Sequence, residues 1–248
     1  MQSIHISLSA EKIGEIAGFP ITNTLLMSFI ATLILSVFAF FIFKNIKIVP
    51  SRLQTVGELA VGEIYSYTSS TLENEKLARK YFPLIVTIFL FVLISNIIQF
   101  IPGVGSIGFH HLVNGKEVFE PLFRSANTDL NVTLALAIIS FLFIEIAGIS
   151  QLGFLSYFKK FFNFKSILGF VIGIIDLFSE LARLISFSFR LFGNIFAGEV
   201  IIAVIIFFVP VILPVPLMLF EVFVAVIQAA IFSLLTLFFI KIAVTEHH

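Results

Sequence analysis

The sequence predicts an all-α polytopic membrane protein with about five membrane-crossing helices and one amphipathic surface helix. Its last two helices are expected to be long, strongly tilted and paired as a hairpin. Hydrophobic residues make up 59% of the 248 residues, and charged residues make up only 12%, about half the share of a soluble domain. Several uncharged apolar runs are also long enough to cross a bilayer core of about 30 Å.

The composition excludes several classes of protein. Lysine plus arginine and aspartate plus glutamate each number 15, so the chain lacks the basic excess of a nucleic-acid binder. It contains no cysteine, so neither a disulfide framework nor a thiolate metal site is possible. We expect no nucleic-acid partner, no cofactor and no bound metal. Residues 1–23 have no basic start before an apolar run, which argues against a signal or transit peptide.

We expect the whole chain, 1–248, to form one integral membrane domain. Its first half contains two spans and a surface helix. After the outer N-terminal segment, residues 24–47 form the first span. Residues 52–79 carry apolar side chains at three- and four-residue steps, which predicts an amphipathic helix on the inner membrane surface. Residues 81–101 form the next span, which ends at Pro102-Gly103.

A polar outer loop, 102–129, follows, and residues 130–150 form the third span. His110 and His111 lie in the outer loop, and we interpret them as solvated residues rather than metal ligands. A short loop rich in lysine then leads to the C-terminal third.

The C-terminal third predicts two long helices, 167–209 and 217–245, joined by a proline-rich turn. The first has no turn chemistry inside it, and as a single helix it would be about 64 Å long. That is about twice the thickness of the bilayer core, so we expect one strongly tilted helix rather than two short passes.

The basic residues between and beside the spans divide unequally between the two sides of the membrane. With the N-terminus outside and the C-terminus in the cytoplasm, three lie on the outer side: Lys12, Lys116 and Arg124. The inner side receives Lys44, Lys47, Arg52, Lys76, Arg79, Lys80, Lys159, Lys160, Lys165 and the nearby Lys241. The positive-inside rule therefore predicts this orientation.

Ionisable residues lie inside the predicted helices, where each charge costs on the order of 3 kcal/mol on insertion scales. They are Glu145, Asp176, Glu180, Arg183, Arg190, Glu199 and Glu221. A helix packed only for stability would use small residues instead, which argues against an inert membrane scaffold. We therefore expect function from these charges.

Five polar residues share one stripe of the first long helix, because they are separated by three, four or seven positions: Asp176, Glu180, Arg183, Arg190 and Asn194. The first three are close enough for a structural ion pair. Arg190 has no acid three or four positions away, so it requires a carboxylate from another helix or another chain.

Glu199 and Glu221 both lie near the turn between the long helices, and Gln228 shares a face with Glu221. If the helices form an antiparallel hairpin, the two acids can line one polar path that opens to the outer side. Alternatively, one of them only satisfies a neighbouring donor.

The run Ser186-Phe-Ser-Phe-Arg190-Leu-Phe-Gly-Asn194-Ile-Phe-Ala-Gly-Glu199 resembles the signature of the a subunit of rotary F-type ATP synthases. Asp176 lies fourteen positions before Arg190, where that family has a carboxylate, and the segment from Ile227 to Phe232 resembles the family's last helix. The segment from Asp129 to Leu134 and Asn96 with the following Pro102-Gly103 also agree. The resemblance covers nearly the whole chain from about residue 20.

The resemblance implies a non-catalytic stator subunit with two half-channels that load and unload the carboxylates of a rotor ring. Arg190 and Asn194 would face that ring, and Glu199, Glu221 and Gln228 would line the outer half-channel. Asp176, Glu180 and Arg183 would serve the inner half-channel or form a structural ion pair. No role for Glu145 is implied.

The implied partners are the ring of c subunits, b-type peripheral stalk subunits, the rest of the ATP synthase and the lipid bilayer. The implied location is a bacterial inner membrane, with an organellar inner membrane as the alternative.

Two other functions are open on the sequence alone. Several members of the family carry one histidine and one acid where this chain has Glu199 and Glu221, so Na⁺ is an alternative coupling ion. A secondary ion transporter is an alternative of a different class, although no internal repeat or broken helix supports it. No glycine-rich phosphate loop followed by lysine is present, so the chain itself is not expected to make ATP.

Overall fold

A computed structural model describes residues 10–245, apart from residues 17 and 45 and the segments 48–49, 102–103, 105–106, 114–115, 162–165 and 210–211. Its helices are α1 (Asn23–Lys44), α2 (Arg52–Leu72), α3 (Glu75–Ile97), α4 (Leu130–Leu152), α5 (Phe154–Phe161), α6 (Ile167–Phe208) and α7 (Pro214–Val244). Short 3-10 turns are η1 (Ile98–Phe100) and η2 (Ala126–Thr128). The predicted break at Pro102-Gly103 and Lys165 lie outside the described residues, as do the side chains of His110, His111, Lys116, Lys159 and Lys160.

Within the described residues, five helices are long and apolar enough to cross a membrane: α1, α3, α4, α6 and α7. They carry many exposed large apolar side chains, which is the pattern of a surface that meets lipid or other membrane subunits. The prediction of an all-α polytopic membrane protein is confirmed.

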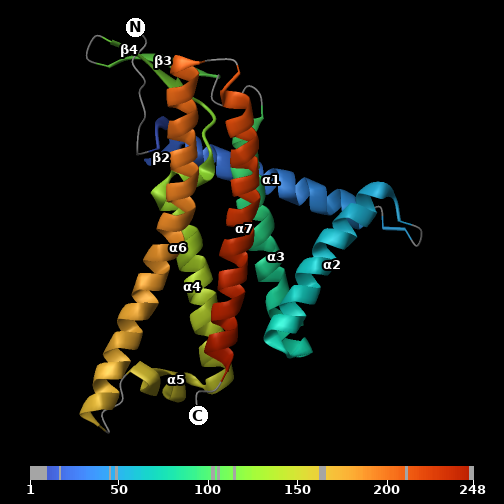
Figure 1. Ribbon diagram of the computed structural model, residues 1–248, viewed down its shortest axis with the longest axis vertical. Helices are drawn as coiled ribbons and strands as arrows, with labels where there is room; N and C mark the ends of the chain where they lie inside the picture. Colours follow the sequence, from blue (N-terminus) through green and yellow to red (C-terminus); the bar gives the residue numbers. More distant parts are fainter. Residues whose placement is uncertain are drawn as a thin grey trace.

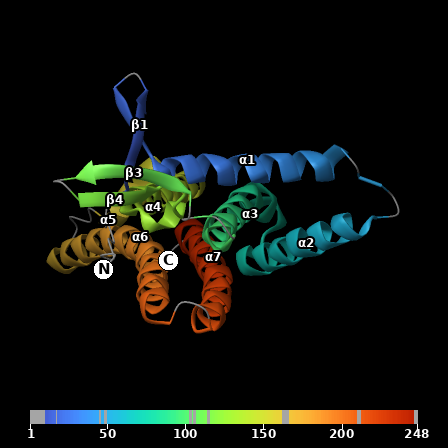
Figure 2. The same cartoon turned by 90° about the horizontal axis from the view of Figure 1, so that it is seen from above.

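Four helices, α3, α4, α6 and α7, run along the long axis of the molecule, and α1 runs across that axis (Figure 1). The chain leaves this group along α1 and returns along α2, and α6 and α7 lie side by side (Figure 2). Because α1 and α6 run in such different directions, they cannot both stand perpendicular to one flat bilayer.

Helix α6 is continuous over its 42 residues, as the sequence predicts. It is about 63 Å long at the usual rise per residue. Ser166 caps its first turn by accepting a hydrogen bond from the Gly169 amide at 2.9 Å. Helix α7 begins at Pro214, three residues before the predicted start, because a proline is tolerated in the first turn of a helix.

The interior of the four-helix group consists of two apolar clusters along α3 and α7. One lies where these helices meet α2 and α4, around Tyr81, Ile144 and Leu237. The other lies where they meet α4 and α6, around Val92, Leu191 and Phe232. The second cluster packs α6 against its neighbours and thereby positions the charged residues of this helix.

Three local predictions need correction. The surface helix expected over 52–79 ends at Leu72, because Glu73 adopts a left-handed conformation with φ of 53° and Asn74 caps α3 by accepting from the amides of Lys76 and Leu77. The lysine-rich loop after the third span contains helix α5. The N-terminal segment and the loop before α4, for which no regular structure was predicted, each contain a two-stranded hairpin: β1 (Lys12–Ile16) with β2 (Phe19–Thr22), and β3 (Gly108–Val113) with β4 (Lys116–Pro121).

Candidate functional site: the charged residues of the long helices

The polar residues predicted to share one stripe of α6 lie at its margin between packed and exposed faces. Glu180 is buried, Arg183 and Arg190 are half-buried, and Asn194 is exposed. The stripe begins near α5, at what we call the α5 end of the molecule. It leads toward the end that carries β3 and β4, which we call the hairpin end (Figure 1).

Arg183 and Glu180 form an ion pair, with 2.7 Å between Arg183 Nη1 and Glu180 Oε2. The Arg183 guanidinium also lies 3.8 Å from the centre of the Phe239 ring on α7, a cation–π contact. The arginine therefore links α6 to α7 as well as neutralising a buried acid. These contacts suit the structural alternative for this pair.

Arg190 has a different environment two turns farther along α6. Its Nη2 donates to Ser186 Oγ at 3.3 Å, and in the part of the chain that the structure describes no carboxylate lies within ion-pair distance of it. Asn194 follows one turn later with its side chain exposed. Asp176, at the α5 end, is half-buried and has no hydrogen bond or ion pair among the described residues.

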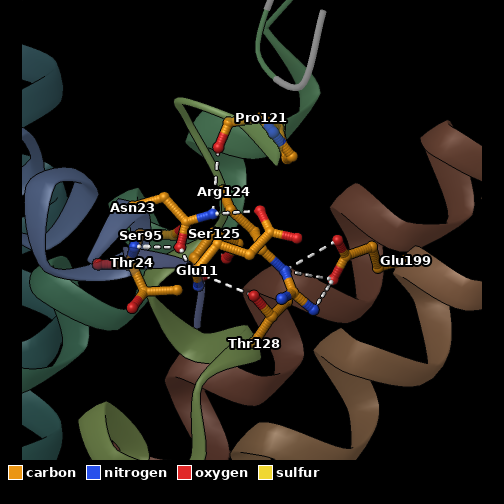
Figure 3. A network of polar contacts seen from close by, with 9 residues as sticks. All are labelled: Glu11, Asn23, Thr24, Ser95, Pro121, Arg124, Ser125, Thr128 and Glu199. Atoms are coloured by element: carbon orange, nitrogen blue, oxygen red, sulfur yellow. Dashed lines mark hydrogen bonds and ion pairs between the residues drawn. The ribbon is translucent and has the colours of Figure 1, made fainter. Parts of the chain in front are cut away.

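Glu199, near the hairpin end of α6, pairs with Arg124. Arg124 Nε lies 3.1 Å from Glu199 Oε1 and 3.4 Å from Oε2, and Arg124 Nη2 lies 3.2 Å from Oε2. The arginine side chain is only 5% exposed, whereas that of Glu199 is 34% exposed. Figure 3 shows the guanidinium turned toward the carboxylate from the loop side. The sequence indicates only that Arg124 is a charge in the predicted outer loop, and its pairing with Glu199 was not predicted.

The loop that carries Arg124 is fixed by hydrogen bonds to α3. Ser125 Oγ donates to the Ser95 carbonyl at 3.2 Å, and Asn127 Nδ2 donates to Asn96 Oδ1 at 2.6 Å. Thr128 Oγ1 closes the turn by donating to the Ser125 carbonyl at 2.7 Å. The four polar residues Ser95, Ser125, Asn127 and Thr128 are buried, so this segment has a fixed position against the helices. Figure 3 shows Ser95, Ser125 and Thr128 of this group.

The start of α1 packs against the same loop. Asn23 Nδ2 lies 3.1 Å from Glu11 Oε2 and 3.1 Å from the Pro121 carbonyl oxygen (Figure 3). Thr24 Oγ1 donates to Asp129 Oδ2 at 2.9 Å, while Asp129 caps α4. These bonds join the N-terminal segment to the loop that supplies Arg124.

Glu221 on α7 packs directly against Gly198 of α6, the residue before Glu199. A methyl group on Gly198 would overlap the Glu221 carboxyl group. Glu221 is 9% exposed, and its Oε2 is buried with no hydrogen-bond partner among the described residues. The structure thus places Glu221 at the α6–α7 contact, beside the residue that precedes Glu199. Gln228 lies buried two turns farther along α7.

Glu145 lies on α4 beside Tyr157 of α5. The Tyr157 ring packs on Gly148, where a methyl group would overlap it. Burial raises the pKa of the Tyr157 hydroxyl well above its usual range, and the charge and hydrogen bonding of Glu145 raise it further. Sequence reasoning missed Tyr157, although the strongly amphipathic pattern of Phe154–Phe161 could have predicted a buried aromatic there. His110 and His111 belong to β3.

Comparison with known proteins decides the family. Residues 25–241 match the family model described as ATP synthase A chain. The chain belongs to the ATP synthase subunit a family. It is 37% identical to ATP synthase subunit a of Campylobacter jejuni over 193 residues, which cover 78% of this chain and 77% of the relative.

Two further relatives of this subunit a family match more of the chain. ATP synthase subunit a of Campylobacter hominis is 33% identical over 240 residues, which cover 95% of this chain and 96% of the relative. The sodium ion specific ATP synthase subunit a of Propionigenium modestum is 35% identical over 234 residues, which cover 93% of this chain and 77% of the relative. The predicted resemblance is confirmed at the level of the family.

Proposed function

We propose that this chain is the stator ion-channel subunit of a rotary ATP synthase, in which Arg190 faces the carboxylates of a rotor ring. The observation that carries the proposal is the environment of Arg190. It is a half-buried arginine in an apolar helix, and the described residues offer it no carboxylate. An intramembrane charge of this kind requires a partner, and a rotor carboxylate supplies one.

The chemistry of arginine suits this role. Its guanidinium stays protonated at any accessible pH, so it cannot pass a proton between the two sides of the membrane. It stabilises the ionised form of a nearby carboxylate. A protonated rotor acid that reaches Arg190 therefore releases its proton, and Asn194, one turn away, faces the same ring.

Two half-channels complete the mechanism. Glu199, Glu221 and Gln228 line the outer one near the hairpin end. Asp176 serves the inner one near the α5 end, while Glu180 and Arg183 hold the helices there. Ions cross by entering one half-channel, binding to the ring carboxylates while the ring turns, and leaving by the other half-channel. The driving force is about 2.3 kcal/mol per elementary charge for each 100 mV.

The proposed setting is a bacterial inner membrane, with the N-terminus outside, the C-terminus in the cytoplasm, and partners that include a ring of c subunits and b-type stalk subunits. ATP formation belongs to other subunits. The proton is the proposed coupling ion. Na⁺ is a second candidate because a relative that matches 93% of this chain is named sodium ion specific.

Cysteine cross-linking tests whether the Arg190 stripe faces the ring. The chain has no natural cysteine, so Asn194→Cys introduces a single thiol on that face. Paired with cysteines placed along the outer helix of the ring subunit, it should form an a–c disulfide on oxidation. Ile195→Cys, at a fully buried position, and Phe29→Cys, exposed on α1, should not. Cross-links from either control but not from Asn194→Cys would contradict the proposal.

A further inference from the structure

We propose that Arg124 and Glu199 form a fixed ion pair at the hairpin end, so that Glu221, rather than Glu199, receives the ion in the outer half-channel. This inference rests on the function proposed above. It assigns different roles to two acids that the sequence placed on one path. Arg124 and Glu199 become positioning residues.

The contacts between Arg124 and Glu199 involve both oxygens of the carboxylate. Nε and Nη2 of the guanidinium lie within 3.1 to 3.4 Å of them. In this fork arrangement the charge of the acid is compensated by hydrogen bonds to a group that cannot lose its proton. A proton that binds to Glu199 would have to displace one of these bonds and leave Arg124 without compensation from this acid.

Arg124 is held in place rather than free to swing out. Its side chain is 5% exposed, and the next residue is tied to α3 through the bond from Ser125 Oγ to the Ser95 carbonyl. Asn127 fixes the same segment to Asn96 at 2.6 Å. A long surface arginine loses much conformational entropy on pairing, but here the fold has already placed the loop.

Glu221 has the opposite environment. Its carboxyl group packs on Gly198, and its buried Oε2 has no hydrogen bond within the described residues. A proton or a water molecule can therefore be taken up at Oε2 without breaking an ion pair. Glu221, on α7, thereby packs against α6, the helix that carries Arg190.

Paired substitutions separate a fixed ion pair from a proton carrier. In vesicles with the assembled synthase, Glu199→Gln should lower ATP-driven proton pumping about tenfold or more, because it removes the carboxylate that accepts hydrogen bonds from Nε and Nη2 of the buried Arg124. The double variant Arg124→Gln/Glu199→Gln should restore pumping to within about threefold of the unmodified complex. Glu221→Gln should abolish pumping, with or without Arg124→Gln. Arg124→Lys, which keeps the charge, should retain more activity than Arg124→Gln.

The rate of proton pumping is divided by the amount of assembled complex, which is measured by immunoblotting and by the ATPase activity of the membranes. A double variant as inactive as Glu199→Gln would overturn the inference, as would normal pumping by Glu199→Gln or Glu221→Gln. If the double variant does not assemble, the exchanged pair Arg124→Glu/Glu199→Arg keeps both charges, and an assembled but inactive exchange would also overturn the inference.

Two controls isolate the inference from general effects and from the proposed function. Lys12→Gln/Glu15→Gln removes an exposed ion pair of 2.6 Å, more than half exposed on both sides, and should leave pumping unchanged. Arg190→Ala in the same vesicles tests the proposed function separately. If Arg190→Ala pumps normally, the function is wrong; if only the double variant fails, the roles of the two acids are wrong.

Discussion

Arg190 Nη2 donates to Ser186 Oγ at 3.3 Å, a contact within one turn of α6, and no carboxylate of the described residues forms an ion pair with this arginine. Arg183, two turns earlier, instead has Glu180 Oε2 at 2.7 Å. Two arginines on one stripe thus have opposite environments. We attribute the difference to function. Arg183 links α6 to α7, and we propose that Arg190 binds a carboxylate of another chain.

The contact between Gly198 and Glu221 predicts a strong effect of a single methyl group. Gly198→Ala would overlap the Glu221 carboxyl group and push this acid or α7 away. We expect ATP-driven proton pumping to fall about tenfold or more, because displacement by about 1 Å can cost two orders of magnitude in rate.

The matched control is Gly62→Ala on α2, where a methyl group meets nothing within 4 Å. This substitution should leave pumping unchanged. Equal pumping by the two alanine variants would show that Glu221 need not lie against Gly198.

The polar groups at the α5 end should separate into structural and ion-conducting residues. Arg183→Ala removes the ion pair of the buried Glu180, and breaking a buried ion pair costs about 3–5 kcal/mol, so the amount of assembled synthase should fall. Asp176→Asn breaks no bond among the described residues, so assembly should be normal while pumping falls.

Immunoblots of solubilised synthase and pumping in the same membranes measure the two effects. Normal assembly with Arg183→Ala, together with defective pumping, would instead place Arg183 in the ion path. Unchanged pumping with Asp176→Asn would remove Asp176 from it.

Tyr157 should act as a protonated hydrogen-bonding group and not as a titrating one. Its raised pKa means that the folded chain holds this proton more tightly than the unfolded chain does. The corresponding stabilisation is fully present below the usual tyrosine pKa of about 10 and is lost only as the pH rises through the higher, folded-state pKa. Tyr157→Phe should therefore destabilise the subunit by about 1 kcal/mol equally between pH 6 and 9.

Thermal denaturation of the purified synthase in detergent at several pH values, followed by the loss of subunit a from the complex, measures this effect. Ser36→Ala, an exposed serine on α1, is a control for the loss of one hydroxyl. A destabilisation that changes steeply between pH 6 and 9 would show that Tyr157 or its partner Glu145 titrates in that range.

The continuity of each helix and the spacing of charges along it could be predicted from the sequence, because helical periodicity and turn chemistry are local properties. The continuous α6 lacks any turn signal, and Arg190 lacks an acid at helical spacing. The pairing of Glu180 with Arg183 follows from the same spacing. These features require no knowledge of how the helices pack.

Contacts between distant segments could not be predicted in the same way. Arg124 and Glu199 are 75 residues apart, and no pattern in either segment indicates the other. The contact of Glu221 with Gly198 depends on the register between α6 and α7. The end of α2 at Leu72 did have a local signal, since Asn74 followed by Glu75 is a typical helix start.

The proposed function depends most directly on Arg190, so replacing this residue is the most direct test. In membrane vesicles that contain the assembled synthase, Arg190→Ala should abolish ATP-driven proton pumping while the amounts of subunit a and of bound ATPase stay normal. Normal pumping by Arg190→Ala, with intact assembly, would contradict the claim that this arginine meets the carboxylates of the rotor.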